Sequence, residues 1–296
     1  MKTLEKKYSV AAFVDILGYK DLIQNESIER EIELFNDLKN TIDIALAGTV
    51  ESAKSIFNFL DSKYESSQKI SERLKVKQFS DNIYFSFDYA EQNDLDLYFG
   101  IYIISNISSF YQRLMLGKGY FVRGGIAFGL NMVDKNFIFS TALIKAVETE
   151  KDTIYPRITL HSELKEKYLF GKDNPFKEIT HGLYIQDWAE HVFLNPFHQT
   201  SRNINMIESL SLSQEELGQF EEAITKSQER VINKFNKGFA HLFDDKAFNS
   251  ISRGHISKKI KKYKNRNQGV YEKYLWSRNF LNWVDNKQSE LSFKYV

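Results

Sequence analysis

Two aspartates stand where apolar, strand-like runs end. Asp15 follows the run from Tyr8 to Val14, and Asp81 lies in a turn between two further strand-like runs. If the three strands are neighbours in one sheet, the two carboxylates lie close together and repel each other. A hard cation such as Mg²⁺ or Mn²⁺ would stabilise such a pair, because both ions favour oxygen ligands. A strand-end aspartate is more often a turn or cap residue, so the hypothesis rests on the pair.

The chemistry expected of such a pair is phosphoryl or nucleotidyl transfer. Two divalent ions about 3.5 to 4 Å apart activate an attacking oxygen and neutralise a leaving phosphate. The turn after Asp15 contains Leu17 and Gly18 at the entrance to a helix, and backbone N–H groups there are candidates for binding the substrate phosphates. Lys77 lies four residues before Asp81, so strand alternation places its side chain on the same face as that carboxylate.

Hydrophobic periodicity predicts the elements that must position these residues. Strand-like runs are expected at 8–14, 74–79, 83–87, 120–128, 155–160 and 182–185. Helical spacing is expected at 28–46, 50–63, 95–116 and 143–150. The order βααββαβαβ indicates an α/β sandwich. We therefore expect a domain over residues 1–190 that holds these residues, and a mainly helical C-terminal extension over 191–296, with helical patterns at 214–235 and 271–284.

The composition limits the class of protein. The chain has 296 residues, of which 42% are hydrophobic, and its formal net charge is +1, so no global field favours nucleic acid or anionic lipid as a partner. Without cysteine, disulfides, thiolate catalysis and cysteine metal sites are excluded. No window reaches the roughly 18 apolar residues of a membrane span. We expect a soluble, cytoplasmic protein, and the basic run over 258–266 is interpreted as a solvated helix face.

Four segments together resemble class III nucleotidyl cyclase domains in content and order. They are AAFVDILGYKDLI (11–23), VKQFSDNIYFSF (76–87), YFVRGGIAFG (120–129) and FSTALIKAVETEKDTIYPRITL (139–160). Within that family, residues 142–158 and the late segment KYLWSRNFLNW (273–283) are most similar to the bacterial pyrimidine cyclases of the Pycsar anti-phage system. The resemblance covers about residues 9–160 and reaches the C-terminal third only through the last segment.

This resemblance implies a class III core with a βααββαβ order and a role for each matching residue. Asp15 and Asp81 would hold two divalent ions, Mg²⁺ or Mn²⁺, with the Ile16 carbonyl as a further ligand. Lys77 stands at the position that reads the base in purine cyclases. The resemblance also implies a head-to-tail homodimer with the site at its interface.

The sequence departs from the purine cyclases at two places. Ser80 replaces the usual glycine before the second aspartate, which is compatible with a turn. The helix over 143–148 lacks the Asn and Arg that meet the transition-state charge in purine enzymes. Arg123 is the first candidate to replace them, because its neighbouring glycines would let a triphosphate or a partner chain approach closely, and Lys145 is the second. A structural ion pair is an equal alternative for Arg123.

The leading hypothesis is a cyclase that converts UTP or CTP to the 3′,5′-cyclic nucleotide and pyrophosphate, as a second-messenger synthase in anti-phage defence. An ammonium at Lys77 can donate to the carbonyl at position 2 that uracil and cytosine share. The sequence is also compatible with two alternatives. One is a purine nucleotide cyclase with the same metal site, and the other is an inactive nucleotide-binding regulator.

Overall fold

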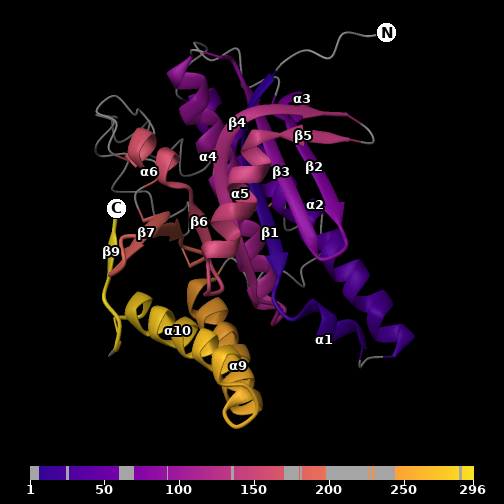
Figure 1. The fold of residues 1–296 in the computed structure, drawn as a ribbon, viewed down its shortest axis with the longest axis vertical. Helices are drawn as coiled ribbons and strands as arrows, with labels where there is room; N and C mark the ends of the chain where they lie inside the picture. Colours follow the sequence, from indigo (N-terminus) through magenta and orange to yellow (C-terminus); the bar gives the residue numbers. More distant parts are fainter. Residues whose placement is uncertain are drawn as a thin grey trace.

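The computed structural model describes residues 7–24, 27–59, 70–91, 93–134, 137–169, 180, 182–197, 226, 229, 244–286 and 289–296. These residues form a mixed α/β fold around one nine-stranded mixed sheet (Figure 1). The strands are β1 (Lys7–Ile16), β2 (Leu74–Phe79), β3 (Asn82–Tyr89), β4 (Val122–Val133), β5 (Ile138–Ser140), β6 (Ile158–Leu160), β7 (Tyr184–Asp187), β8 (Val192–Leu194) and β9 (Phe293–Tyr295). The helices are α1 (Tyr19–Gln24), α2 (Ile28–Phe59), α3 (Ile70–Arg73), α4 (Asp94–Gly117), α5 (Thr141–Asp152), α6 (Ser162–Leu169), α9 (Asp245–Tyr263) and α10 (Gln268–Val284).

The strand order is β2-β3-β1-β4-β6-β8-β7-β9, and β5 pairs with β4. β1 therefore lies between β3 and β4 and is antiparallel to both. β4 and β6 are parallel, and α5 is the helix of the crossover between them. Because β1 is covered on both sides, its side chains Val10, Ala11, Ala12 and Val14 are almost fully buried.

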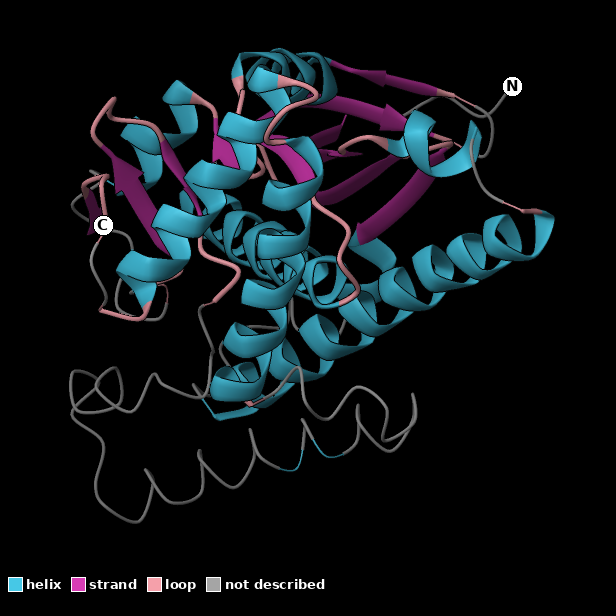
Figure 2. Cartoon of the chain, turned by 90° about the horizontal axis from the view of Figure 1, so that it is seen from below, coloured by secondary structure: helices cyan, strands magenta, loops and turns pink. Residues whose placement is uncertain are grey.

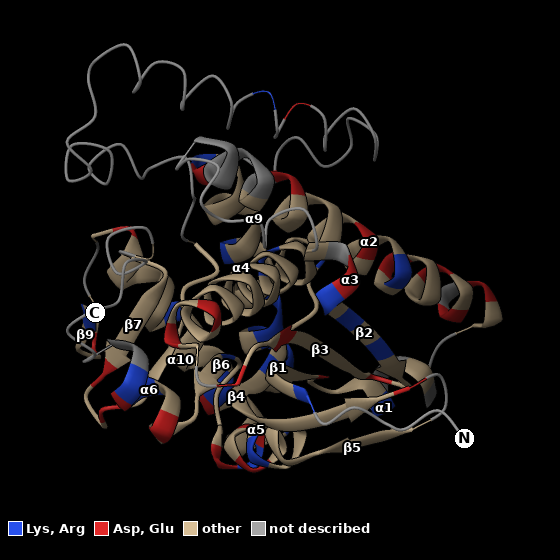
Figure 3. Cartoon of the chain, turned by 90° about the horizontal axis from the view of Figure 1, so that it is seen from above, with Lys and Arg blue, Asp and Glu red and all other residues tan. Residues whose placement is uncertain are grey.

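Helices cover both faces of the sheet (Figure 2). α4 packs against β1 and β3 on one face, and α2 packs on the outside of α4. On the other face, α5 lies across β4 and β1 (Figure 3). α4 is apolar over most of its length and starts at an Asn93 cap whose side chain accepts from the Asp96 N–H, which fits a helix in the centre of the core.

The expected pair of helices at 28–46 and 50–63 is wrong, because α2 runs without a break from Ile28 to Phe59. The sequence pattern changes at Gly48, but this glycine does not end the helix. A Cβ atom at Gly48 would lie 2.6 Å from the Phe110 ring of α4. Gly48 therefore allows two helices to pack closely and does not act as a break.

The other expected elements are close to the observed ones. α4 and α5 extend the expected helices by one or two residues at each end. The strand expected over 155–160 begins only at Ile158, since Pro156 has no N–H and sits in a bend. The short elements α3 and β5 were not expected. The helical pattern at 214–235 lies outside the described residues, apart from Lys226 and Glu229.

The C-terminal third contributes both helices and strands. α9 and α10 pack on each other, and α9 also contacts α4. Beyond the boundary expected at residue 190, β8 and β9 join the same sheet as β1. Aromatic rings tie α10 to these strands, with Trp276 and Phe280 in contact with both Phe193 and Phe293. The sheet is therefore continuous across that boundary. No described helix combines the length and the apolar character that crossing a membrane requires.

Candidate functional site

The strand register brings the predicted residues to one end of the sheet. Asp15, near the end of β1, lies opposite Asn82 at the start of β3 and opposite Arg123 near the start of β4. Asp81 directly precedes Asn82 in the two-residue turn that joins β2 to β3. The three strands are neighbours, as the sequence hypothesis required. Asp15, Asp81 and Arg123 thus share one edge of the fold.

Arg123 lies between two carboxylates. Its Nε is 3.2 Å from Asp15 Oδ2 and 2.6 Å from Oε1 of Glu150, which comes from α5. Nε carries one hydrogen, and Asp15 accepts it, so Glu150 Oε1 is held at ion-pair distance without a hydrogen bond. Within the described part of the chain, neither Nη1 nor Nη2 of Arg123 donates a hydrogen bond. The outer part of the guanidinium remains available to an anion.

Burial raises the pKa values of two acids of this site, Asp15 and Glu150. Burial raises the pKa of Asp15, the hydrogen bond and charge of Arg123 lower it, and the nearby Asp81 carboxylate raises it. Burial also raises the pKa of Glu150, whose side chain is 5% exposed, while the Arg123 charge lowers it. The effect of Asp81 on Asp15 is the repulsion expected of adjacent carboxylates.

The geometry of the β2–β3 turn explains the residue before Asp81. Ser80 has φ of 56°, a left-handed conformation in which glycine carries no steric cost. When only the first residue of a two-residue turn has a positive φ, glycine is favoured at that position. Asn82 Nδ2 donates to Asp81 Oδ1 at 3.0 Å and so orients the carboxylate.

The site offers oxygen ligands for a divalent cation, but few of these ligands are carboxylates. The described residues contain no group of three or more His, Cys, Asp or Glu side chains that could hold a metal ion. A magnesium ion in an enzyme commonly uses one or two carboxylates and completes its shell with water and substrate phosphates. The repulsion between Asp15 and Asp81 is what a cation would relieve. The donor set therefore fits a site of that kind.

Lys77 lies on the sheet face that carries Asp15. Along the register, Lys77 is opposite Tyr84, and Tyr84 is opposite Phe13. Phe13 precedes Asp15 by two residues, so both side chains project from one face. Lys77 is half-buried, and the other lysine of β2 on this face, Lys75, is paired with Asp88 at 2.7 Å.

Of the two residues expected to supply backbone donors in the turn after β1, Leu17 is already bonded within the fold. The Leu17 N–H donates to the Phe121 carbonyl at 2.8 Å, so it is not available to a phosphate. Gly18 is exposed with φ of 75°, and α1 after it has only six residues. Ile16 is the last residue of β1 and its side chain is buried.

The glycines beside Arg123 serve internal packing. A Cβ at Gly124 would lie 2.5 Å from the Phe13 carbonyl oxygen, and a Cβ at Gly125 would lie 2.1 Å from the Ala146 carbonyl oxygen of α5. The expectation that these glycines admit a triphosphate or a partner chain is therefore wrong. They let β1 and α5 approach β4, and the second contact fixes the helix that carries Glu150.

Two other basic residues, Lys145 of α5 and Arg157 just before β6, form ion pairs outside the acidic pair. Lys145, the second candidate for transition-state charge, forms an ion pair of 2.5 Å with Glu163 of α6, whose side chain is exposed, so this contact is weak. Arg157 is buried, pairs with Asp187 at 2.5 Å and lies 5.6 Å from the Trp276 ring centroid. Arg157 therefore acts as a structural contact in this fold.

Sequence reasoning missed two charged residues of the site. An acid on an amphipathic helix usually lies on its solvated face, but Glu150 is buried against Arg123. Lys273 of α10 is half-buried, and the charges that act on it are those of Arg123, Asp15 and Glu150. The only sequence signal for Lys273 was its place at the head of KYLWSRNFLNW. Both residues lie far along the chain from the two aspartates.

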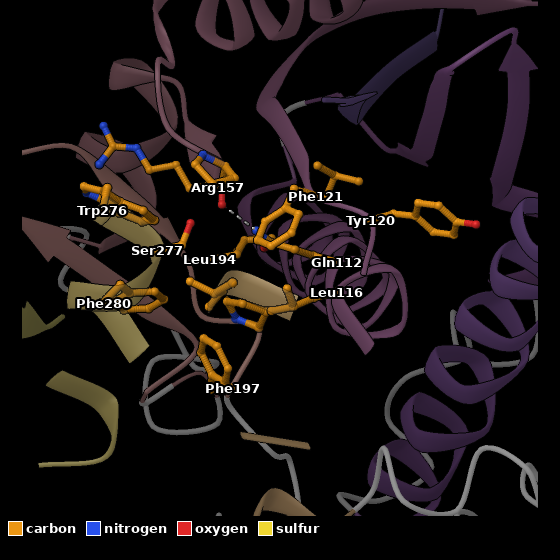
Figure 4. Close-up of a pocket in the computed structure, with 14 residues that line it drawn as sticks. Gln112, Leu116, Tyr120, Phe121, Arg157, Leu194, Phe197, Trp276, Ser277 and Phe280 are labelled. Carbon is orange, nitrogen blue, oxygen red and sulfur yellow. Dashed lines mark hydrogen bonds between the residues drawn. The ribbon is translucent and has the colours of Figure 1, made fainter. Parts of the chain in front are cut away.

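A small pocket lies beside this site, on the inner side of α10 (Figure 4). Phe121, Leu194, Phe197 and Phe280 give it a mainly apolar lining, and Gln112 donates to the Pro156 carbonyl at its wall. None of the residues predicted for the site lines it. The pocket therefore carries no part of the predicted chemistry.

A comparison of the sequence with protein-family models finds no match, and a search of curated proteins finds no relative. The functional case therefore rests on the geometry of the site and on the motif resemblance.

Proposed function

We propose that this protein is a nucleotidyl cyclase that converts a pyrimidine nucleoside triphosphate, UTP or CTP, into the 3′,5′-cyclic nucleotide and pyrophosphate. The observation that carries the proposal is the meeting of Asp15, Asp81 and Arg123 at one end of the sheet. Two acids that repel each other stand next to a guanidinium whose Nη groups have no hydrogen bond within the described residues. Such a site can take both cations and a polyphosphate.

Each residue has a part in this proposal. Asp15 and Asp81, with the Ile16 carbonyl, would hold two divalent ions, Mg²⁺ or Mn²⁺. Bound there, such ions would lower the pKa of the ribose 3′-hydroxyl and neutralise charge on the phosphates. Arg123 would bind the phosphate oxygens through Nη1 and Nη2, while Asp15 holds its Nε in place.

The reaction forms one bond and breaks one. The ribose 3′-oxygen attacks the α-phosphorus, the bond from that phosphorus to the bridging oxygen of the β-phosphate breaks, and pyrophosphate leaves. The hydroxyl proton passes to water. Arg123 stabilises the negative charge that develops on the phosphates during this step. In purine cyclases an Asn and an Arg have this role, and the α5 helix lacks both.

Base selection is proposed for Lys77, which shares the sheet face of Asp15. A lysine ammonium donates hydrogen bonds and cannot accept them, which suits the carbonyl at position 2 of a pyrimidine. Head-to-tail homodimerisation and a role in anti-phage signalling belong to the same proposal by resemblance, and a cytoplasmic location belongs to it because the chain contains no cysteine.

The experiment is a substrate panel. Purified protein is incubated with Mn²⁺ and an equimolar mixture of ATP, GTP, UTP and CTP, and cyclic products are separated by chromatography. The proposal predicts a cyclic pyrimidine nucleotide as the main product, and a lower pyrimidine-to-purine ratio for Lys77→Ala. A cyclic purine as the main product would assign a purine cyclase instead. Binding without any cyclic product would assign an inactive regulator.

A further inference from the structure

We infer that Lys273, on the C-terminal helix α10, is a phosphate-binding residue of the same site. The inference rests on the proposed function and deepens it, because it gives the C-terminal third a part in substrate binding. Lys273 lies outside the part of the chain that the motif resemblance covers continuously.

The packing of α10 places Lys273 beside the strand ends that carry the site. The next residue, Tyr274, packs edge-on against Phe121, with ring centroids 4.8 Å apart at 74°. Phe121 precedes Arg123 by two residues, and its carbonyl accepts the Leu17 N–H at the end of β1. Trp276, further along the helix, stacks on Tyr155 at 5.2 Å. In Figure 1, α10 lies at the end of the sheet where β1 ends.

The charges around Lys273 are those of the site itself. Burial lowers the pKa of Lys273, and the Arg123 charge lowers it further, whereas the Asp15 and Glu150 carboxylates raise it. These three groups are the ones already joined by the Arg123 ion pairs. Lys273 therefore belongs to the same electrostatic cluster, although it is not directly paired with any member.

The ammonium of Lys273 has no hydrogen bond or ion pair within the described residues. Other partly buried lysines of the fold are paired: Lys75 with Asp88, and Lys118 with Asp37. A partly buried charge without a partner is costly, and a structural lysine is expected to have one. A polyphosphate bound to Arg123 would supply that partner, since it carries several anionic oxygens within reach of more than one cation.

The test measures binding of inorganic tripolyphosphate with Mg²⁺ by calorimetry, using the full chain. We expect Lys273→Met, which keeps the length and apolar stem of the side chain, to weaken binding roughly tenfold or more. Lys273→Arg should recover part of the loss. The matched control is Arg278→Ala, which removes one positive charge from the same helix at a residue 3.8 Å from Glu290. It should bind as the wild type does, and thermal melts check that all variants fold.

The outcomes separate this inference from the proposed function. If wild type and Lys273→Met cyclise a triphosphate with the same KM and bind tripolyphosphate equally, the inference is wrong and the function stands. If Lys273→Met alone loses tripolyphosphate but wild type makes no cyclic product, the anion site stands and the cyclase proposal fails. A wild-type protein that neither binds tripolyphosphate nor makes product contradicts both. If Arg278→Ala lost the same tripolyphosphate affinity, the loss would follow from net charge alone and the inference would be wrong.

Discussion

At the residue scale, Asp81 offers the cleanest test of the acidic pair. Asp15 also accepts a hydrogen bond from Arg123, so its removal would disturb a structural contact. Among the described residues, the Asp81 side chain accepts a hydrogen bond only from its neighbour Asn82. Asp81→Asn keeps that acceptor and removes the charge. We expect cyclase activity to fall below detection in Mn²⁺, and metal-free stability to stay level or rise slightly because the repulsion of Asp15 is relieved. Near-normal turnover in saturating Mn²⁺ would exclude Asp81 from the mechanism.

Arg123 can be tested separately from its structural contacts. Arg123→Gln should lower kcat by roughly 10² or more if the Nη groups stabilise charge on the phosphates. The companion variant Glu150→Gln removes one ion-pair partner and leaves those groups in place, so its effect on kcat should be much smaller. Light scattering on both variants checks for dissociation. Equal losses in the two variants, or a monomeric Arg123→Gln protein, would favour the structural role.

The sequence identified the site residues that lie beside a local signal. Asp15, Asp81 and Arg123 each follow or adjoin a strand end or a turn, and strand adjacency then places them together. Glu150 and Lys273 have no such signal, because their place in the site depends on how α5 and α10 pack on β4. The availability of the Leu17 N–H was equally hidden, since its acceptor, Phe121, is far along the chain.

At the element scale, the β2–β3 turn contains strain that one substitution should relieve. Ser80 occupies a left-handed conformation, which costs a residue with a Cβ about 1 to 2 kcal/mol. Part of the gain from glycine is lost to the entropy of the unfolded chain. Ser80→Gly should therefore raise the free energy of unfolding by about 0.5 to 1 kcal/mol in denaturant titrations. Ser80→Ala keeps the Cβ and should show no gain, and an equal gain for alanine would exclude backbone strain as the cause.

The junction of α9 with the end of α4 should be sensitive to pH through His255. Its Nε2 lies 3.2 Å from the Gly117 carbonyl oxygen, and its ring fills the space next to Gly119. Burial lowers the pKa of His255 below 6.5, the hydrogen bond with the Gly117 carbonyl partly offsets this, and the Lys258 and Lys259 charges lower the pKa further. The unfolded chain then binds the proton more readily, so this contribution to stability is complete above pH 6.5 and declines as the pH falls towards the folded pKa.

The measurement compares the wild type with His255→Gln, whose amide can still donate to Gly117. Free energies of unfolding are determined at pH 7.5 and pH 5.5. The wild type should lose more stability between the two values than the variant, in which this titration is absent. An equal loss in both proteins would show that His255 makes no contribution.

Hydrophobic periodicity predicted some elements of the fold and not others. The apolar pattern predicted α4 closely, because an apolar run of that length is stable as a helix buried in the core. It divided α2 at Gly48, since a glycine that favours close helix packing looks in sequence like one that ends a helix. Long-range pairings such as β7 with β9 were not accessible, because they depend on the whole C-terminal segment returning to the sheet.

At the scale of the whole molecule, we predict a homodimer. Phe139 of β5 and Phe137, in the turn directly before this strand, are 63% and 74% exposed. Exposed apolar side chains that lie together indicate a contact surface. Light scattering should give twice the monomer mass of 34.7 kDa, and Phe137→Ser with Phe139→Ser should shift it towards the monomer. Ile154→Ser, at another exposed apolar residue, is the control. A wild-type monomer at working concentration would contradict the prediction.

The central claim is that this chain makes a cyclic nucleotide, and the stoichiometry of its products tests it most directly. Wild type and Asp81→Asn are each incubated with Mn²⁺ and either UTP or CTP, and cyclic nucleotide and pyrophosphate are measured together. We predict equal molar amounts of both products from the wild type with at least one of these substrates, and neither product from Asp81→Asn. Pyrophosphate released without cyclic nucleotide, or no product from either triphosphate, would contradict the proposed reaction.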